Sequence, residues 1–93
     1  MRLHILHHAA HRAVHGAWMA AELAHHGYQI SPGSLYPTLH KMETEGLIKS
    51  HPEVVDGRAR RSYVATAKGR RALEAAKNQL RELADEVLGD EAP

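Results

Sequence analysis

The sequence of 93 residues contains no cysteine and no phenylalanine, and its aromatic residues are one tryptophan and three tyrosines. The absence of cysteine excludes disulfide bonds, thiolate metal ligands and cysteine nucleophiles, and it is compatible with a reducing compartment. No apolar run approaches the roughly 20 residues of a membrane span, and the histidine-rich N-terminus lacks the apolar core of a secretory signal. We therefore expect a cytoplasmic protein without a membrane partner.

Catalytic motifs are missing as well. The sequence holds no recognisable arrangement of nucleophile, base and orienting acid, no glycine loop that could cradle a phosphate, and no H-E-x-x-H zinc motif. We therefore predict that the protein is not an enzyme and requires no cofactor. Its length suits one small domain, and domains of this size often gain stability from a partner subunit.

Acidic residues are absent from a stretch that is rich in cations. Residues 57–73 contain Arg58, Arg60, Arg61, Lys68, Arg70 and Arg71, with no Asp or Glu among them. The net charge is only +1 because acidic residues gather from Glu82 onward. The molecule is expected to have a basic part that could meet phosphate, although a charge run can equally be a solvated face.

A helix predicted between Ser31 and Gly46 also has an outward face without acids. Ser31 is a typical N-cap, Pro32 suits the first turn, and Gly46 can adopt the left-handed conformation that ends a helix. Leucine and methionine at helical spacing define its buried stripe, at Leu35, Leu39 and Met42. The opposite face carries Gly33, Ser34, Pro37, His40, Lys41 and Thr44. Pro37 predicts a bend or a late start near Tyr36.

This helix offers groups that can contact DNA. Hydroxyl and imidazole groups can donate to or accept from phosphates and base edges, and Lys41 adds a cation. The residues that we expect at DNA are Gly33, Ser34, Tyr36, Pro37, Thr38, His40 and Lys41. Tyr36 lies about 90° from the apolar stripe at 100° per residue, so it could also be a residue that flanks the core.

The other predicted elements surround this helix in a definite order. Two helices are expected before it, at residues 2–13 and 17–26 with an interruption at Gly16, and a last helix at 67–88 capped by Thr66. Extended segments at 47–51, ended by Pro52, and at 60–65 can pair as a hairpin with a longer, arginine-bearing tip.

Three helices followed by a hairpin predict a mainly α fold with a small β-hairpin (α+β), in the form of a winged helix-turn-helix with a C-terminal dimerisation helix. Residues 1–66 would form the winged-helix DNA-binding domain, and residues 67–93 a helix continuous with it. In this fold the third helix enters the major groove and the hairpin touches the adjacent backbone. Arg58, Arg60 and Arg61 would neutralise phosphate or reach the minor groove. Side chains alternate along a strand, so Arg60 and Arg61 are not expected to face DNA together.

The last predicted helix carries a heptad pattern. Apolar residues recur at Leu73, Ala76, Leu80, Leu83 and Val87, which is the spacing of a seam between two helices. We predict a homodimer through this seam. The alternative is that the seam packs against its own domain.

Nine histidines are an unusual number for this length. His4, His8 and His11 lie at positions i, i+4 and i+7 of the first predicted helix, with His7 beside them and His15 in the loop that follows. Imidazoles four residues apart can share a divalent ion of the zinc, nickel or cadmium type. Such an ion could act as an effector, although exposed histidines are also common without a metal.

Several motifs together resemble the PadR family of bacterial transcriptional regulators, in its short form with a single C-terminal helix. They are HG at residues 15–16, SPGSLYPTL at 31–39, EGLI at 45–48, DGR at 56–58 with RR at 60–61, and YVATAKG at 63–69. The resemblance implies a dimeric repressor on an inverted-repeat operator in double-stranded DNA, released by a small effector. One departure is Ala17, with Trp18 one position later, where the family often has an aromatic residue directly after the His-Gly pair.

Two other functions remain open from the sequence. The chain could be a histidine-rich metal-binding protein on a winged-helix scaffold that no longer reads DNA. It could also be a winged-helix module for protein interaction. Steeply salt-dependent binding to DNA would distinguish a DNA-binding regulator from these two alternatives.

Overall fold

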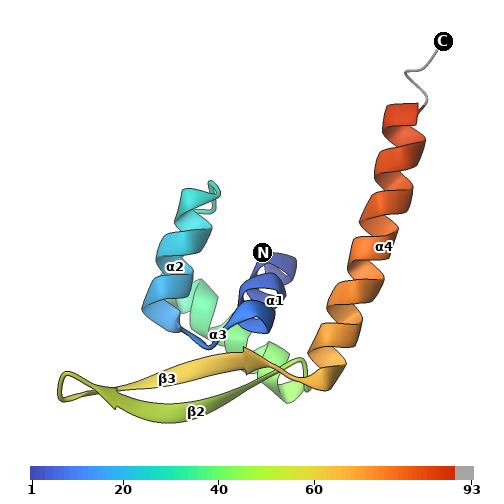
Figure 1. The fold of residues 1–93 in the computed structure, drawn as a ribbon. Helices are drawn as coiled ribbons and strands as arrows, with labels where there is room; N and C mark the ends of the chain where they lie inside the picture. Colours follow the sequence, from blue (N-terminus) through green and yellow to red (C-terminus); the bar gives the residue numbers. More distant parts are fainter. Residues whose placement is uncertain (90–93) are drawn as a thin grey trace.

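The computed structural model describes residues 1–89, which form four helices and three strands. In chain order they are α1 (Arg2–His11), β1 (Val14–His15), α2 (Gly16–His25), α3 (Pro32–Thr44), β2 (Ile48–Val55), β3 (Arg58–Ala65) and α4 (Ala67–Gly89). Helices α1, α2 and α3 cluster on one side of the β2–β3 hairpin, and α4 projects away from them (Figure 1). The predicted fold class is confirmed, and residues 90–93 of the predicted 67–93 segment lie outside the described part.

The sheet contains a short strand that was not predicted. Its order is β1-β3-β2, all antiparallel, with Val14 opposite Tyr63 and His15 opposite Ser62. The first helix therefore ends at His11 instead of residue 13, and Gly16 opens α2 instead of interrupting a helix. The backbone N–H of Trp18 donates to His15 Nδ1 at 3.3 Å, so the imidazole caps α2.

The hairpin is longer and tighter than predicted. Asp56 and Gly57 have φ angles of 53° and 76°, as a two-residue hairpin turn requires, and Val55 pairs directly with Arg58. Arg58 is thus a strand residue and not part of a long tip. Pro52 does not end β2, because β2 lies at the edge of the sheet, where a proline without an N–H is tolerated.

Helix α3 begins where the caps predicted but continues through its inner proline. It runs from Pro32, so the late start near Tyr36 is wrong. Pro37 removes one backbone hydrogen bond, and the complete burial of Leu35 and Leu39 supplies the packing that holds the helix together. Gly46 has a φ of 79°, the left-handed conformation predicted at the end.

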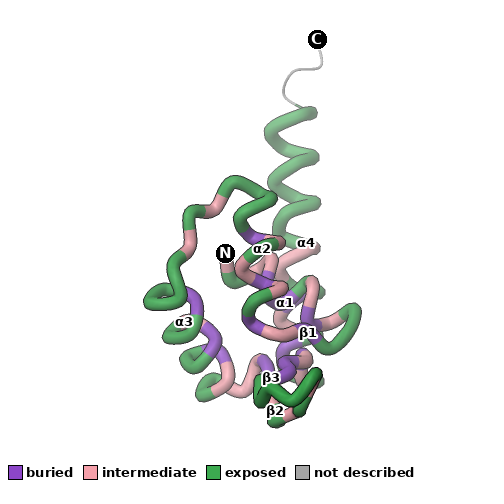
Figure 2. Tube along the Cα trace, turned by 90° about the vertical axis from the view of Figure 1, so that its left-hand side faces the viewer, coloured by how far each residue is buried: buried purple, intermediate pink, exposed green. Residues whose placement is uncertain are grey.

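The core lies between α1, α2, α3 and the start of the hairpin (Figure 2). Its largest fully buried side chains are Ile5, Met19, Leu23, Leu35, Leu39, Met42 and Ile48. Leu73 joins this core and is only 5% exposed. The first part of α4 therefore packs on its own domain, mainly against α1, and Leu73 belongs to the core instead of the predicted dimer seam.

The start of α4 is fixed by several contacts. Thr66 Oγ1 accepts from the N–H of Gly69 at 3.0 Å, which confirms the predicted cap, and Lys68 Nζ donates to the carbonyl of Glu45 at 2.8 Å at the end of α3. A Cβ built on Gly69 would lie 1.9 Å from the carbonyl oxygen of Leu47, so only glycine fits there. No helix within residues 1–89 is both long and apolar enough to cross a membrane.

Candidate nucleic-acid interface

The outward face of α3 is exposed as predicted. Its exposed residues are Gly33, Ser34, Tyr36, Pro37, His40, Lys41 and Thr44, and Thr38 is half-buried. Not all their hydroxyl groups are free. Thr38 Oγ1 donates to the carbonyl of Ser34 at 2.8 Å, and Thr44 Oγ1 donates to that of His40 at 3.0 Å. Thr38 can therefore accept a hydrogen bond from a ligand, but its proton is engaged within its own helix.

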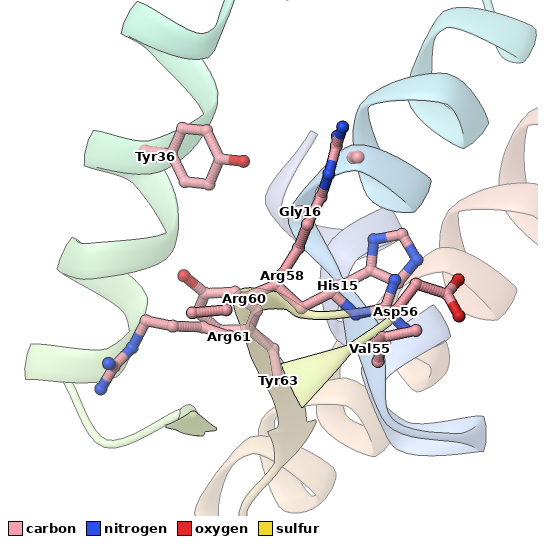
Figure 3. A pocket seen from close by; sticks show the side chains of 11 residues that line it. His15, Gly16, Tyr36, Val55, Asp56, Arg58, Arg60, Arg61 and Tyr63 are labelled. Atoms are coloured by element: carbon pink, nitrogen blue, oxygen red, sulfur yellow. The ribbon is translucent and has the colours of Figure 1, made fainter. Parts of the chain in front are cut away.

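A groove of about 780 Å³ lies between α3, the start of α2 and the hairpin. It brings together four of the predicted residues, Tyr36, Arg58, Arg60 and Arg61. Tyr36 extends from α3 toward Gly16 (Figure 3), and a Cβ on Gly16 would lie 2.7 Å from the Cε1 and hydroxyl oxygen of Tyr36. Tyr36 is 47% exposed, so it forms the wall of the groove and is not a core residue.

The wing arginines differ in how far they are already paired. Arg60 Nε donates to Glu53 Oε1 at 2.9 Å, directly across the hairpin, whereas Arg61 Nε donates to the Ser50 hydroxyl at 3.0 Å. Within residues 1–89 neither Arg58 nor Lys41 has a carboxylate partner. Among the four predicted cations, Arg58 and Lys41 therefore have neither an ion pair nor a side-chain hydrogen bond within this part of the chain, Arg61 has no carboxylate partner either, and Arg60 is partly neutralised.

Two residues that sequence reasoning missed join α3 to the wing. Glu43 accepts hydrogen bonds from both the N–H and the hydroxyl of Ser50, at 2.9 and 2.6 Å, and Ser50 in turn accepts from Arg61. The hydrogen bond from the Ser50 hydroxyl is the main cause that holds the pKa of Glu43 below its usual 4.5. An acid facing inward from α3, seven residues before a strand serine, carries no local signal, because the contact depends on how the hairpin folds back.

The histidines that were predicted as metal ligands do not form one site. His11 Nδ1 lies 2.8 Å from the carbonyl of His7, and the Nδ1 of His15 is engaged in the cap of α2. His8 instead meets Glu22 and His26, whose candidate ligand atoms all lie within 4.8 Å of one another. Burial, followed by the charge of His7, lowers the pKa of the His8 imidazole and favours its neutral form.

Helix α4 presents an apolar stripe beyond the body of the domain. Leu80, Leu83 and Val87 are each more than half exposed, and Leu88, which was not predicted, is 65% exposed. Ala76 is half-buried. The helix is about 34 Å long at 1.5 Å per residue, so its second half extends well past the contact with α1 (Figure 1).

The element order, the three-stranded antiparallel sheet and the groove between α3 and the hairpin define the winged helix-turn-helix class. Within that class, the family described as "Transcriptional regulator PadR-like family" matches this chain over residues 5–75. The chain belongs to this family of transcriptional regulators, which confirms the resemblance drawn from the sequence. Its members are regulators and not enzymes.

Individual relatives agree with this assignment. Over 92 residues the chain is 60% identical to Transcriptional regulator Rv3488 of Mycobacterium tuberculosis, covering 99% of this chain and 86% of that protein. A PadR-like transcriptional regulator of Bacillus cereus has a similar structure, with a TM-score of 0.86 and 29% identity over 99% of this chain and 91% of that one. A PadR family regulator of Eggerthella lenta gives a TM-score of 0.81 at 27% identity, covering 99% and 82%.

Proposed function

We propose that this transcriptional regulator is a homodimeric repressor that binds an inverted-repeat operator in double-stranded DNA and is released by a small effector or metal ion. The observation that carries the proposal is the acid-free, exposed face of α3 next to a hairpin that bears three arginines. Tyr36 at the edge of that face and the three arginines border one groove, which fits a helix in the major groove with a wing on the adjacent backbone.

The first turn of α3 adds an electrostatic argument. It contains no acidic residue, and Gly33 follows Pro32 at the positive end of the helix dipole. A Cβ on Gly33 would approach only the Ser31 hydroxyl, at 3.6 Å, so this turn is open toward solvent. The first turn of α3 would bind phosphate, and together with Lys41 further along the same helix and Arg58 on the wing it would fix the register. His40 would reach toward base edges, while Tyr36, whose ring is directed toward Gly16, lines the groove between helix and wing.

Dimerisation is supported by the apolar stripe of α4. Four large apolar side chains on one projecting helix are costly to leave in water, and a second copy of the same helix offers a matching surface. A two-fold dimer presents two copies of α3, so its operator has two inverted half-sites about one helical turn of DNA apart.

Footprinting of the chain's own upstream region, with and without added metal ions, tests the proposal. At low salt we expect protection of two symmetric half-sites. Lys41→Ala and Arg58→Ala should each weaken binding and lower the dependence of log K on log salt by about one ion. Arg81→Ala, which removes an exposed cation from α4, is the matched control and should leave the footprint unchanged. Equal effects of all three substitutions would contradict the proposed surface.

A further inference from the structure

We infer that His8, Glu22 and His26 form a binding site for a divalent transition-metal ion of the zinc type. The site joins α1 to the C-terminal end of α2. Its ligand atoms are Nε2 of His8, Oε1 of Glu22 and Nε2 of His26, and they come from segments that the fold brings together. It shares only His8 with the set predicted from the sequence.

The geometry is close to that of a bound ion. Glu22 Oε1 lies 3.3 Å from Nε2 of His26 and 3.7 Å from Nε2 of His8. A tetrahedral zinc ion with bonds of about 2.0–2.1 Å places neighbouring ligand atoms about 3.3–3.4 Å apart. The carboxylate is therefore already near the required distance from both imidazoles. The two imidazoles lie within 4.8 Å of each other at their ligand atoms, so rotation of the exposed His26 side chain can close the set.

A second observation points to the same place. The Nδ1 atom of His4 is buried and has no hydrogen-bond partner among the described residues. The ring of His4 lies 4.9 Å from that of His26, measured between centroids. A buried polar atom without a partner is destabilising, and a bound ion with its water ligand would supply that partner.

The surroundings leave room for the ion and favour transition metals. A groove of about 350 Å³ is lined by His4, His7, His8 and His26 on one side and by the α4 residues Leu73, Lys77 and Leu80 on the other. Imidazole nitrogens with one carboxylate suit zinc, nickel, copper or cadmium, whereas magnesium and calcium prefer oxygen ligands throughout. The three ligand side chains are between 18% and 42% exposed, so an ion can enter from solvent.

The position of the groove gives the site a regulatory use. Leu80 lines the groove and also belongs to the apolar stripe of α4. An ion that holds α1 against α2 therefore also fixes the surface against which α4 packs as it extends from the domain. A change in the direction of α4 relative to the domain would alter the spacing of the two recognition helices in a dimer. This consequence rests on the proposed function, but metal binding itself does not.

Calorimetry with the full, tag-free chain and Zn²⁺ tests the site directly. We expect one ion per chain, and at least tenfold weaker binding in Glu22→Gln and in His26→Ala. His25→Ala is the matched control for His26, since it removes a neighbouring exposed imidazole outside the cluster, and it should bind as the unmodified chain does. No binding, or equal losses in His25→Ala and His26→Ala, would overturn the inference. Loss of Zn²⁺ binding in His11→Ala without any loss in Glu22→Gln would also overturn it.

Thermal unfolding of the same variants separates lost ligation from a damaged fold. Zn²⁺ should raise the melting temperature of the unmodified chain and of His25→Ala, and should raise that of Glu22→Gln by clearly less at the same Zn²⁺ concentration. A similar rise in Glu22→Gln would contradict the site. These measurements contain no DNA, so a failure of operator binding leaves their result unaffected. Operator affinity with and without Zn²⁺, compared between the unmodified chain and Glu22→Gln, then tests the regulatory consequence by itself.

Discussion

Replacing Gly69 with alanine should be among the most destabilising single changes in this molecule. The added Cβ would lie 1.9 Å from the carbonyl oxygen of Leu47 and 2.9 Å from its carbon. Carbon and oxygen atoms normally approach no closer than about 3.3 Å, so the start of α4 must move by about 1.4 Å. The same carbonyl accepts the N–H of Thr66 at 3.1 Å, and such a movement breaks that hydrogen bond as well.

Overpacking of a core costs about 1–3 kcal/mol and a lost backbone hydrogen bond about 1 kcal/mol, so Gly69→Ala should lower the free energy of unfolding by about 2–4 kcal/mol. Urea unfolding followed by circular dichroism, at one fixed protein concentration, measures this loss. Gly33→Ala is the control, because the added Cβ has room there. This substitution should stabilise α3 by up to about 1 kcal/mol. If Gly69→Ala proved as stable as the unmodified chain, the close packing of α4 against Leu47 would be refuted.

Three further predictions concern the interface and the dimer. Gly16→Ala should push the Tyr36 ring aside and lower the free energy of unfolding by only about 0.5–1.5 kcal/mol, because the end of that half-exposed ring can turn. The same change should weaken DNA binding, as measured by fluorescence anisotropy. An unchanged affinity would show that Tyr36 is not part of the interface. Glu43→Gln should lower the free energy of unfolding at neutral pH. The difference between this variant and the unmodified chain should shrink as the pH falls below 4.5, because a lowered carboxyl pKa contributes stability only while Glu43 stays ionised in the folded state. Urea unfolding at several pH values measures this, and parallel pH profiles would contradict it. Leu83→Glu should shift the chain toward monomer in sedimentation velocity, while Asn78→Glu on the opposite face of α4 should not, and an intact Leu83→Glu dimer would place the interface elsewhere.

Features with local signals were predictable from the sequence. The cap at Thr66, the left-handed end of α3 at Gly46 and the Asp56-Gly57 turn each depend on residues within a few positions of one another. The exposed face of α3 followed from the helical spacing of its apolar residues. These elements in order were sufficient for the winged helix-turn-helix.

Features that depend on tertiary packing were not predictable in the same way. Strand β1 is only two residues long and exists because Val14 meets Tyr63 across 49 positions of sequence. Leu73 fits a heptad seam and a domain core equally well, and only the docking of α4 on α1 decides between them. Likewise, Glu22 and His26 become partners of His8 only when α2 packs beside α1.

Selection of binding sequences from random duplex DNA by the full chain, followed by affinity measurements across a range of salt concentrations, tests the central claim most directly. The account predicts an enriched inverted repeat whose affinity falls steeply as salt rises, with a smaller salt dependence in Lys41→Ala and Arg58→Ala. No enriched repeat, or an affinity that does not depend on salt, would contradict the assignment of α3 and the wing as a DNA-binding surface.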